Sequence, residues 1–322
     1  MSRSDTRAPE TGNAKGRNVS QTVKVFVGVP TCRNPVGLRK TLDSIFALET
    51  EHSVQVAVID NDAGQQGRSV VESYPAPISY VPEARAGIPF ARNAIIATFL
   101  ESSCDHLLMI DDDEMASRSW IDALVVALQQ GADVVAGPVV PVILGTLPPG
   151  LLEEDYTKSQ LPVLEGVERV DSTANIGMSR AFLLRCEGHF FNESYAMSGG
   201  SDSEFLRRTA RLGTLHAFAA KGLVYEDIGP SRLSQDWLLK RHFRNGTVYG
   251  RVTAEQKGRI KAMLSLGFRS LALIFRSNIR RLQSRGNPRI EFLSMRDRAR
   301  GSGIWSGLNN RIYDEYDPKN YR

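Results

Sequence analysis

The stretch HLLMIDDDEMASRSW, residues 106–120, sets a short apolar run directly before four consecutive acidic residues. Such a run is typical of a buried parallel strand, and the acids then follow its carboxyl end. Upstream, similar strands are expected at residues 23–29 (VKVFVGV), 54–59 (VQVAVI) and 78–81. Segments with apolar residues at helical spacing alternate with them. This alternation predicts an α/β fold: a mixed, mostly parallel sheet with helices on both faces and ligands bound at the carboxyl ends of its strands.

The chain of 322 residues is expected to comprise three parts: a disordered leader at residues 1–21, a folded domain at 22–250 and a basic helical extension at 251–322. The extension holds 16 Lys and Arg against 6 Asp and Glu, which leaves 24 against 30 for residues 1–250. An acidic body argues against a nucleic-acid-binding domain and suits metal-dependent chemistry. Without a signal peptide or a spanning apolar run, a cytoplasmic location is expected.

Polar residues follow three of the predicted strands. Residues 30–34 (PTCRN) come after the first strand, 60–62 (DND) after the second and 111–114 (DDDE) after the fourth. Four successive carboxylates repel one another, and Mg²⁺ or Mn²⁺ held with phosphate oxygens would relieve that repulsion. The alternative is a solvated acidic turn that caps the following helix. Asp60 is interpreted equally as a turn residue or as an acceptor for a base or ribose.

Two further segments place charged residues at the starts of helices. Residues 87–93 (GIPFARN) put Arg92 near a helix N-terminus, where phosphate would bind, although a plain surface arginine is the alternative. In residues 198–202 (SGGSD), glycines lead into a helix with Asp202 at its start. Asp202 is then either a capping residue or a general base that a closing loop delivers to a hydroxyl.

Taken in order, the segments VPTCRN, VIDND, GIPFARN, MIDDDEMASRSWIDAL and GGSDSEF resemble glycosyltransferase family 2, the inverting nucleotide-sugar transferases of the GT-A fold. The resemblance covers about residues 22–250, and it is greatest to bacterial exopolysaccharide β-glucosyltransferases of the succinoglycan type. It implies transfer of a hexose, with glucose expected, from a UDP-sugar to a saccharide or lipid-linked oligosaccharide. It also implies inversion to a β linkage.

The resemblance further implies roles for individual residues. Asp111 and Asp113 would hold Mn²⁺ or Mg²⁺, Arg92 would lie near the diphosphate, and Asp202 would be the catalytic base. The remaining donor-binding residues would be Pro30, Thr31, Arg33, Asp60, Asn61 and Asp112, together with Asp111. This chain departs from the family pattern in two places. Ser201 replaces an acid beside the base, and Tyr225 stands where relatives often have His, which argues against a metal ligand there.

Apolar residues in the extension recur at helical spacing from Leu264 to Leu282, with arginines on the adjoining face. Residues 257–285 are therefore interpreted either as a helix that binds an anionic membrane surface or as one packed on the domain. Two other functions stay open on the sequence. A nucleotidyltransferase on a similar sheet would release pyrophosphate, and a non-catalytic protein could bind nucleic acid through the tail.

Overall fold

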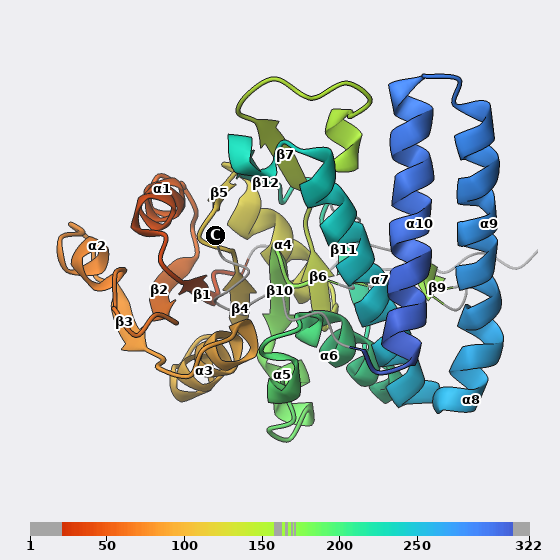
Figure 1. The fold of residues 1–322 in the computed structure, drawn as a ribbon. Coiled ribbons are helices and arrows are strands. Elements are labelled where there is room, and N and C mark those ends of the chain that lie inside the picture. Colours follow the sequence, from red (N-terminus) through yellow and green to blue (C-terminus); the bar gives the residue numbers. More distant parts are fainter. Residues whose placement is uncertain (1–20, 158–162, 165–166, 169, 171, 312–322) are drawn as a thin grey trace, which may run out of the picture.

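The structure, a computed structural model, describes residues 21–157, 163–164, 167–168, 170 and 172–311 (Figure 1). The predicted leader at 1–21 lies almost entirely outside these residues. Within them the main sheet has seven strands, ordered β11-β6-β10-β4-β1-β2-β3. All run parallel except β10, which is antiparallel to both of its neighbours. Their bounds in that spatial order are His216–Phe218, Val134–Ala136, Ile176–Ser179, His106–Met109, Lys24–Thr31, Ser53–Asp60 and Ser79–Pro82.

Helices cover both faces of this sheet, which confirms the predicted fold class (Figure 1). One face packs on α1 (Pro35–Phe46), α2 (Arg68–Glu72) and α4 (Trp120–Gln129), and the other on α3 (Ile88–Glu101), α5 (Arg180–Arg185) and α6 (Ser201–Thr209). Strand β1 shows why its sequence is continuously apolar. Val25 and Val27 lie in the first core and Phe26 in the second, because successive side chains point to opposite faces that are both buried.

A small second sheet adjoins the first and consists of β5 (Glu114–Ala116), β12 (Val224–Ile228) and β7 (Val139–Ile143). The acidic run is therefore not a turn capping a helix. It leaves β4 at Met109 and enters β5 at Glu114, so that it bridges two sheets. A two-stranded pair, β8 (Val163–Leu164) and β9 (Val167–Glu168), lies in the less regular middle of the chain.

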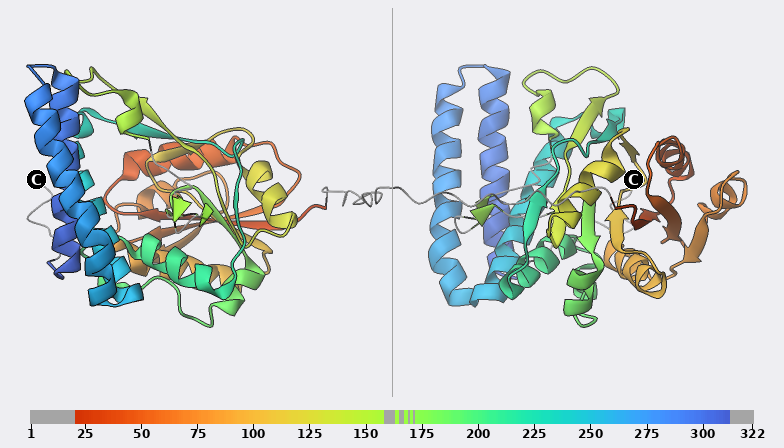
Figure 2. Two further views of the ribbon diagram at one scale, coloured as in Figure 1. Left: turned by 90° about the vertical axis from the view of Figure 1, so that its right-hand side faces the viewer. Right: turned by 180° about the vertical axis from the view of Figure 1, so that it is seen from behind.

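The C-terminal part is helical, as expected, and packs against the rest of the protein (Figures 1 and 2). Its elements are α7 (Gln235–Lys257), α8 (Arg259–Ala262), a π-helical turn (Met263–Gly267), α9 (Phe268–Gln283) and α10 (Pro288–Leu308). Helix α7 runs through residue 250, so the predicted domain boundary falls inside one continuous helix. The division into a domain and an extension stays a prediction.

Glycines allow α10 to lie directly on α7. A Cβ at Gly303 would stand 2.0 Å from the carbonyl oxygen of Phe243, and one at Gly307 would stand 2.0 Å from that of Thr247. Backbone contact this close leaves no room for a side chain. Helix α9 in turn packs mainly on α10, with Arg269 also reaching the ring of Tyr249 on α7, and it forms the outer layer (Figure 2).

Candidate active site

The carboxyl ends of β1 and β4 are joined by hydrogen bonds around Asp112. The Thr31 hydroxyl donates to Asp112 Oδ2 over 2.6 Å, and the Asn34 amide donates to the Asp112 carbonyl over 3.2 Å. Burial raises the pKa of the Asp112 carboxyl to about 7, against the lowering effect of the Thr31 hydrogen bond. Asp112 thus ties the loop after β1 to the acidic run, and its carboxyl is not turned out to solvent.

Each of the other three acids has a partner supplied by the protein. Arg92 lies 3.5 Å from Asp111 Oδ1, and Arg232 lies 2.8 Å from Asp113 Oδ2. Glu114 is fully buried and accepts a hydrogen bond of 3.1 Å from the backbone N–H of Asp111. Two arginines and these hydrogen bonds thus compensate part of the negative charge of the acidic run. That a bound cation relieves the remaining repulsion stays a prediction.

Sequence reasoning missed Arg232. It ends the 3-10 turn Pro230–Arg232, which follows β12, and its guanidinium also reaches Glu226 Oε1 at 3.0 Å. The side chain of Glu226 is only 6% exposed. The signal that could have found Arg232 is its place just after a strand whose last residues include two acids. That strand belongs to the second sheet, which the alternation of the first half does not predict.

The predicted base-binding or ribose-binding residues have structural partners. Asp60 is fully buried, and its carboxylate accepts from Gly67 N at 2.8 Å, Tyr80 OH at 2.9 Å and Asp62 N at 3.2 Å. This geometry matches the turn-residue interpretation of Asp60. A contact of Asp60 with a ribose stays a prediction, and in this conformation its oxygens are already engaged by protein donors.

Asn61 joins the loop after β2 to the start of α3. Its side-chain amide donates to the carbonyls of Glu83 and Arg85, and its Oδ1 accepts from Gly87 N at 2.9 Å. Because Gly87 precedes α3, Asn61 helps to set where Arg92 stands. Arg92 itself is buried, unlike the surface arginine of the alternative interpretation.

Pro30 and Arg33 differ in accessibility. Pro30 is buried in β1 and pairs with Ile59, so only its backbone could line a pocket. Arg33 is exposed, has a positive φ of 55° and pairs with Asp62 at 3.1 Å. Of the two, only Arg33 presents a side chain to the edge of the sheet.

Asp202 lies in the first turn of α6, partly exposed, and its Oδ1 accepts from Ser203 N at 2.9 Å. The segment before it contacts the start of α3, because a Cβ at Gly87 would stand 2.7 Å from the Cβ of Ala196. The Arg92 guanidinium also lies 5.8 Å from the ring centroid of Phe191. The segment just before α6 therefore contacts α3, including Arg92, which pairs with Asp111. This contact brings the helix of Asp202 toward the acidic run.

The glycines before Asp202 do not make a loose loop. Gly200 has a φ of 93°, and a Cβ there would stand 2.5 Å from the side chain of Val248 on α7. Arg251 donates to the Ser198 hydroxyl over 3.0 Å. In this conformation these contacts hold the loop against α7, and the glycines allow the left-handed turn and the close approach to that helix. A closing movement of the loop stays a prediction.

No group of three or more His, Cys, Asp or Glu side chains in the described part of the chain could hold a metal ion by itself. Asp111 and Asp113 provide two carboxylates, with side chains 28% and 25% exposed. Both are accessible from solvent, and each faces an arginine. An anionic ligand with its own oxygens could complete the coordination of a hard cation at this pair.

The fold matches solved glycosyltransferases. The mannosyltransferase PcManGT from Pyrobaculum calidifontis, in complex with GDP-Man and Mn²⁺, is 14% identical with a TM-score of 0.57, over 94% of this chain and 92% of that one. GalNAc-T7 with UDP, GalNAc and Mn²⁺ is 13% identical with a TM-score of 0.51, over 72% and 48%. At these identities the similarity shows the fold alone, which is the GT-A fold.

Sequence comparison is more specific. The family model described as Glycosyl transferase family 2 matches residues 26–186. Over 247 residues the chain is 35% identical to succinoglycan biosynthesis protein ExoM of Rhizobium meliloti (strain 1021), covering 74% of this chain and 77% of that protein. The chain belongs to glycosyltransferase family 2, and the predicted resemblance is confirmed. Membership in this family implies a nucleotide-sugar donor and a saccharide acceptor.

Proposed function

We propose that this glycosyltransferase moves a hexose, with glucose expected, from a UDP-sugar to a saccharide acceptor in exopolysaccharide synthesis. The similarity to succinoglycan biosynthesis protein ExoM supports the pathway, and a lipid-linked oligosaccharide is the proposed acceptor. The observation that carries the proposal is the pairing of Asp111 with Arg92 and of Asp113 with Arg232 at the carboxyl end of β4. A diphosphate brought here would meet two cationic side chains at once.

The residues at this edge fit a divalent cation, Mn²⁺ or Mg²⁺, shared with the donor. Asp111 and Asp113 would hold it, and the phosphates would supply the ligands that the protein lacks. When bound, the cation would neutralise charge that develops on the leaving diphosphate. The guanidinium groups of Arg92 and Arg232 would stabilise the same charge from the protein side.

We propose Asp202 as the general base. Its carboxylate would accept the proton of the acceptor hydroxyl as that oxygen attacks the sugar. The role requires an accessible carboxylate, and Asp202 is partly exposed and accepts a hydrogen bond from the backbone of its own helix. One displacement on the face opposite the nucleotide would invert the anomeric centre and convert an α-linked donor to a β-linked product.

The test is a panel of nucleotide sugars assayed with and without Mn²⁺, with analysis of products. Release of a nucleoside diphosphate is expected, whereas pyrophosphate would indicate a nucleotidyltransferase. Asp202→Asn should lower transfer by about 100-fold or more and leave donor binding nearly intact. The matched control is Asp236→Asn, an acid in the first turn of α7 that is 74% exposed. Equal activity of Asp202→Asn and the control would remove Asp202 from the mechanism.

A further inference from the structure

Helices α8 and α9 and the π-helical turn between them carry large apolar side chains on their outer surface. Ile260, Leu264, Phe268, Leu271, Phe275, Ile279 and Leu282 are between 40% and 83% exposed. Their spacing of three and four residues places them on one side of the helix. We call these seven residues the outer stripe. The sequence left open whether this stripe packs on the domain, and in the structure it does not.

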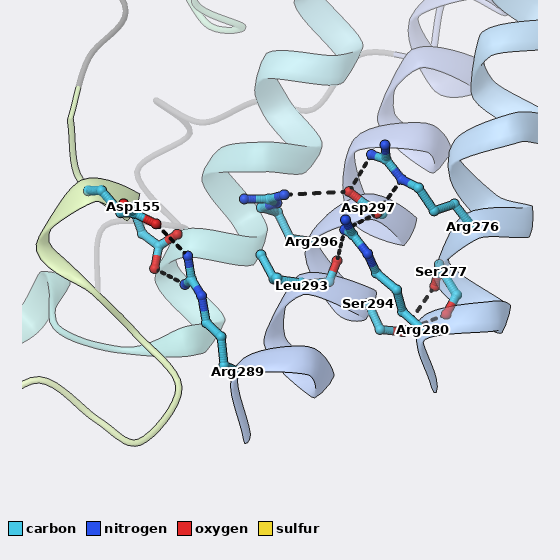
Figure 3. A network of polar contacts seen from close by, with 10 residues as sticks. Asp155, Arg276, Ser277, Arg280, Arg289, Leu293, Ser294, Arg296 and Asp297 are labelled. Atoms are coloured by element: carbon cyan, nitrogen blue, oxygen red, sulfur yellow. Dashed lines mark hydrogen bonds and ion pairs between the residues drawn. The ribbon is translucent and has the colours of Figure 1, made fainter. Parts of the chain in front are cut away.

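The opposite side of α9 makes the contact with α10, through small and polar groups together with Leu273 and Ile274. Ser270 donates to the Gly301 carbonyl over 2.8 Å. Figure 3 shows a second contact, in which Ser294 of α10 donates to the Ser277 carbonyl over 2.8 Å. Arg276 and Arg280 both reach Asp297 of α10 (Figure 3). A helix held only by packing would bury its large apolar residues, so this orientation leaves them available for another surface.

The charge around the outer stripe is of one sign. Residues 256–290 contain nine Lys and Arg and no Asp or Glu. Exposed basic residues accompany the stripe along its length, among them Lys261, Arg269, Arg281 and, just after α9, Arg285. Two copies of this chain joined through the same face would bring these like charges together. An anionic lipid surface would instead attract them, at about fivefold in partitioning for each Lys or Arg near it.

We infer that the outer stripe of α8 and α9 docks the protein on an anionic phospholipid surface, lying in its interface. No helix in the described ranges is long and apolar enough to cross a membrane, so the association is peripheral. The inference does not rest on the proposed sugar transfer. Vesicle binding and transfer to a soluble acceptor are measured separately, and failure of one leaves the other standing.

The test is sedimentation of the full chain with phosphatidylcholine vesicles, with and without phosphatidylglycerol. Binding is expected only with phosphatidylglycerol and should weaken as salt is raised. The triple variant F268S/L271S/F275S should lose about tenfold or more in partitioning, because all three side chains are exposed apolar groups. The control is V36S/L184S/L212S, whose residues are 58% to 71% exposed on other elements. Unchanged circular dichroism would show that both variants stay folded.

Three results would overturn the inference. The first is no sedimentation of the wild type with phosphatidylglycerol vesicles. The second is equal loss in the stripe variant and in the control. The third is a dimer in solution that the stripe variant dissociates, because the outer stripe would then be covered by a second copy.

Discussion

Removing the Arg232 guanidinium tests the idea that the protein itself compensates its acidic run. In Arg232→Met, Glu226 loses a partner at 3.0 Å and Asp113 one at 2.8 Å. Breaking a fully buried pair costs about 3–5 kcal/mol, and an exposed pair contributes about 0.2–1 kcal/mol. Glu226 is 6% exposed but Arg232 is 34% exposed, so solvent reduces the effect. We expect the free energy of unfolding to fall by about 1–3 kcal/mol.

The assay is urea unfolding followed by circular dichroism at pH 7, in the presence of a chelator. The matched control is Lys240→Met. Lys240 pairs with Asp236, and their side chains are 62% and 74% exposed, respectively. That control should change the free energy of unfolding by about 0.5 kcal/mol or less. If Arg232→Met loses no more than Lys240→Met, then the arginine does not compensate these carboxylates and the reasoning fails.

Two other predictions concern the C-terminal helices. Burial, with the nearby Arg296 and Arg300, lowers the pKa of His242 from 6.5 to about 4. As pH falls, this histidine is protonated in the unfolded chain before it is protonated in the folded protein. The free energy of unfolding should therefore decrease between pH 6.5 and pH 4, by up to about 3 kcal/mol. His242→Gln should flatten this pH dependence in urea titrations, and a slope equal to that of the wild type would contradict the prediction. Gly303→Ala should destabilise by about 1–3 kcal/mol in thermal or urea unfolding because its Cβ meets the Phe243 carbonyl. Gly267→Ala, whose Cβ would stand 3.9 Å from its nearest neighbour, should be neutral or stabilising, and similar losses in both would refute the packing argument.

The order of strands and helices could be predicted from the sequence as far as β4. In this first half the spacing of apolar residues indicates each element, and that spacing is a local property of the chain. The antiparallel direction of β10 does not follow from the sequence, since pairing direction depends on the course of the chain between elements. Helix α7 continues to Lys257, across the predicted boundary between residues 250 and 251. Its glycines weaken the helical signal and are needed for the contact with α10.

For the site, the sequence by itself determined which strand ends carry acids and which helix starts carry Arg92 and Asp202. It determined these because side-chain periodicity and turn residues are read over a few neighbouring positions. Only the tertiary structure decided that Arg232 pairs with Asp113 and that Asp60 is fully buried. It also decided that the large apolar residues of the outer stripe face outward. Burial and ion pairing depend on which segments, distant in the sequence, are in contact in the folded protein. Local sequence does not specify those contacts.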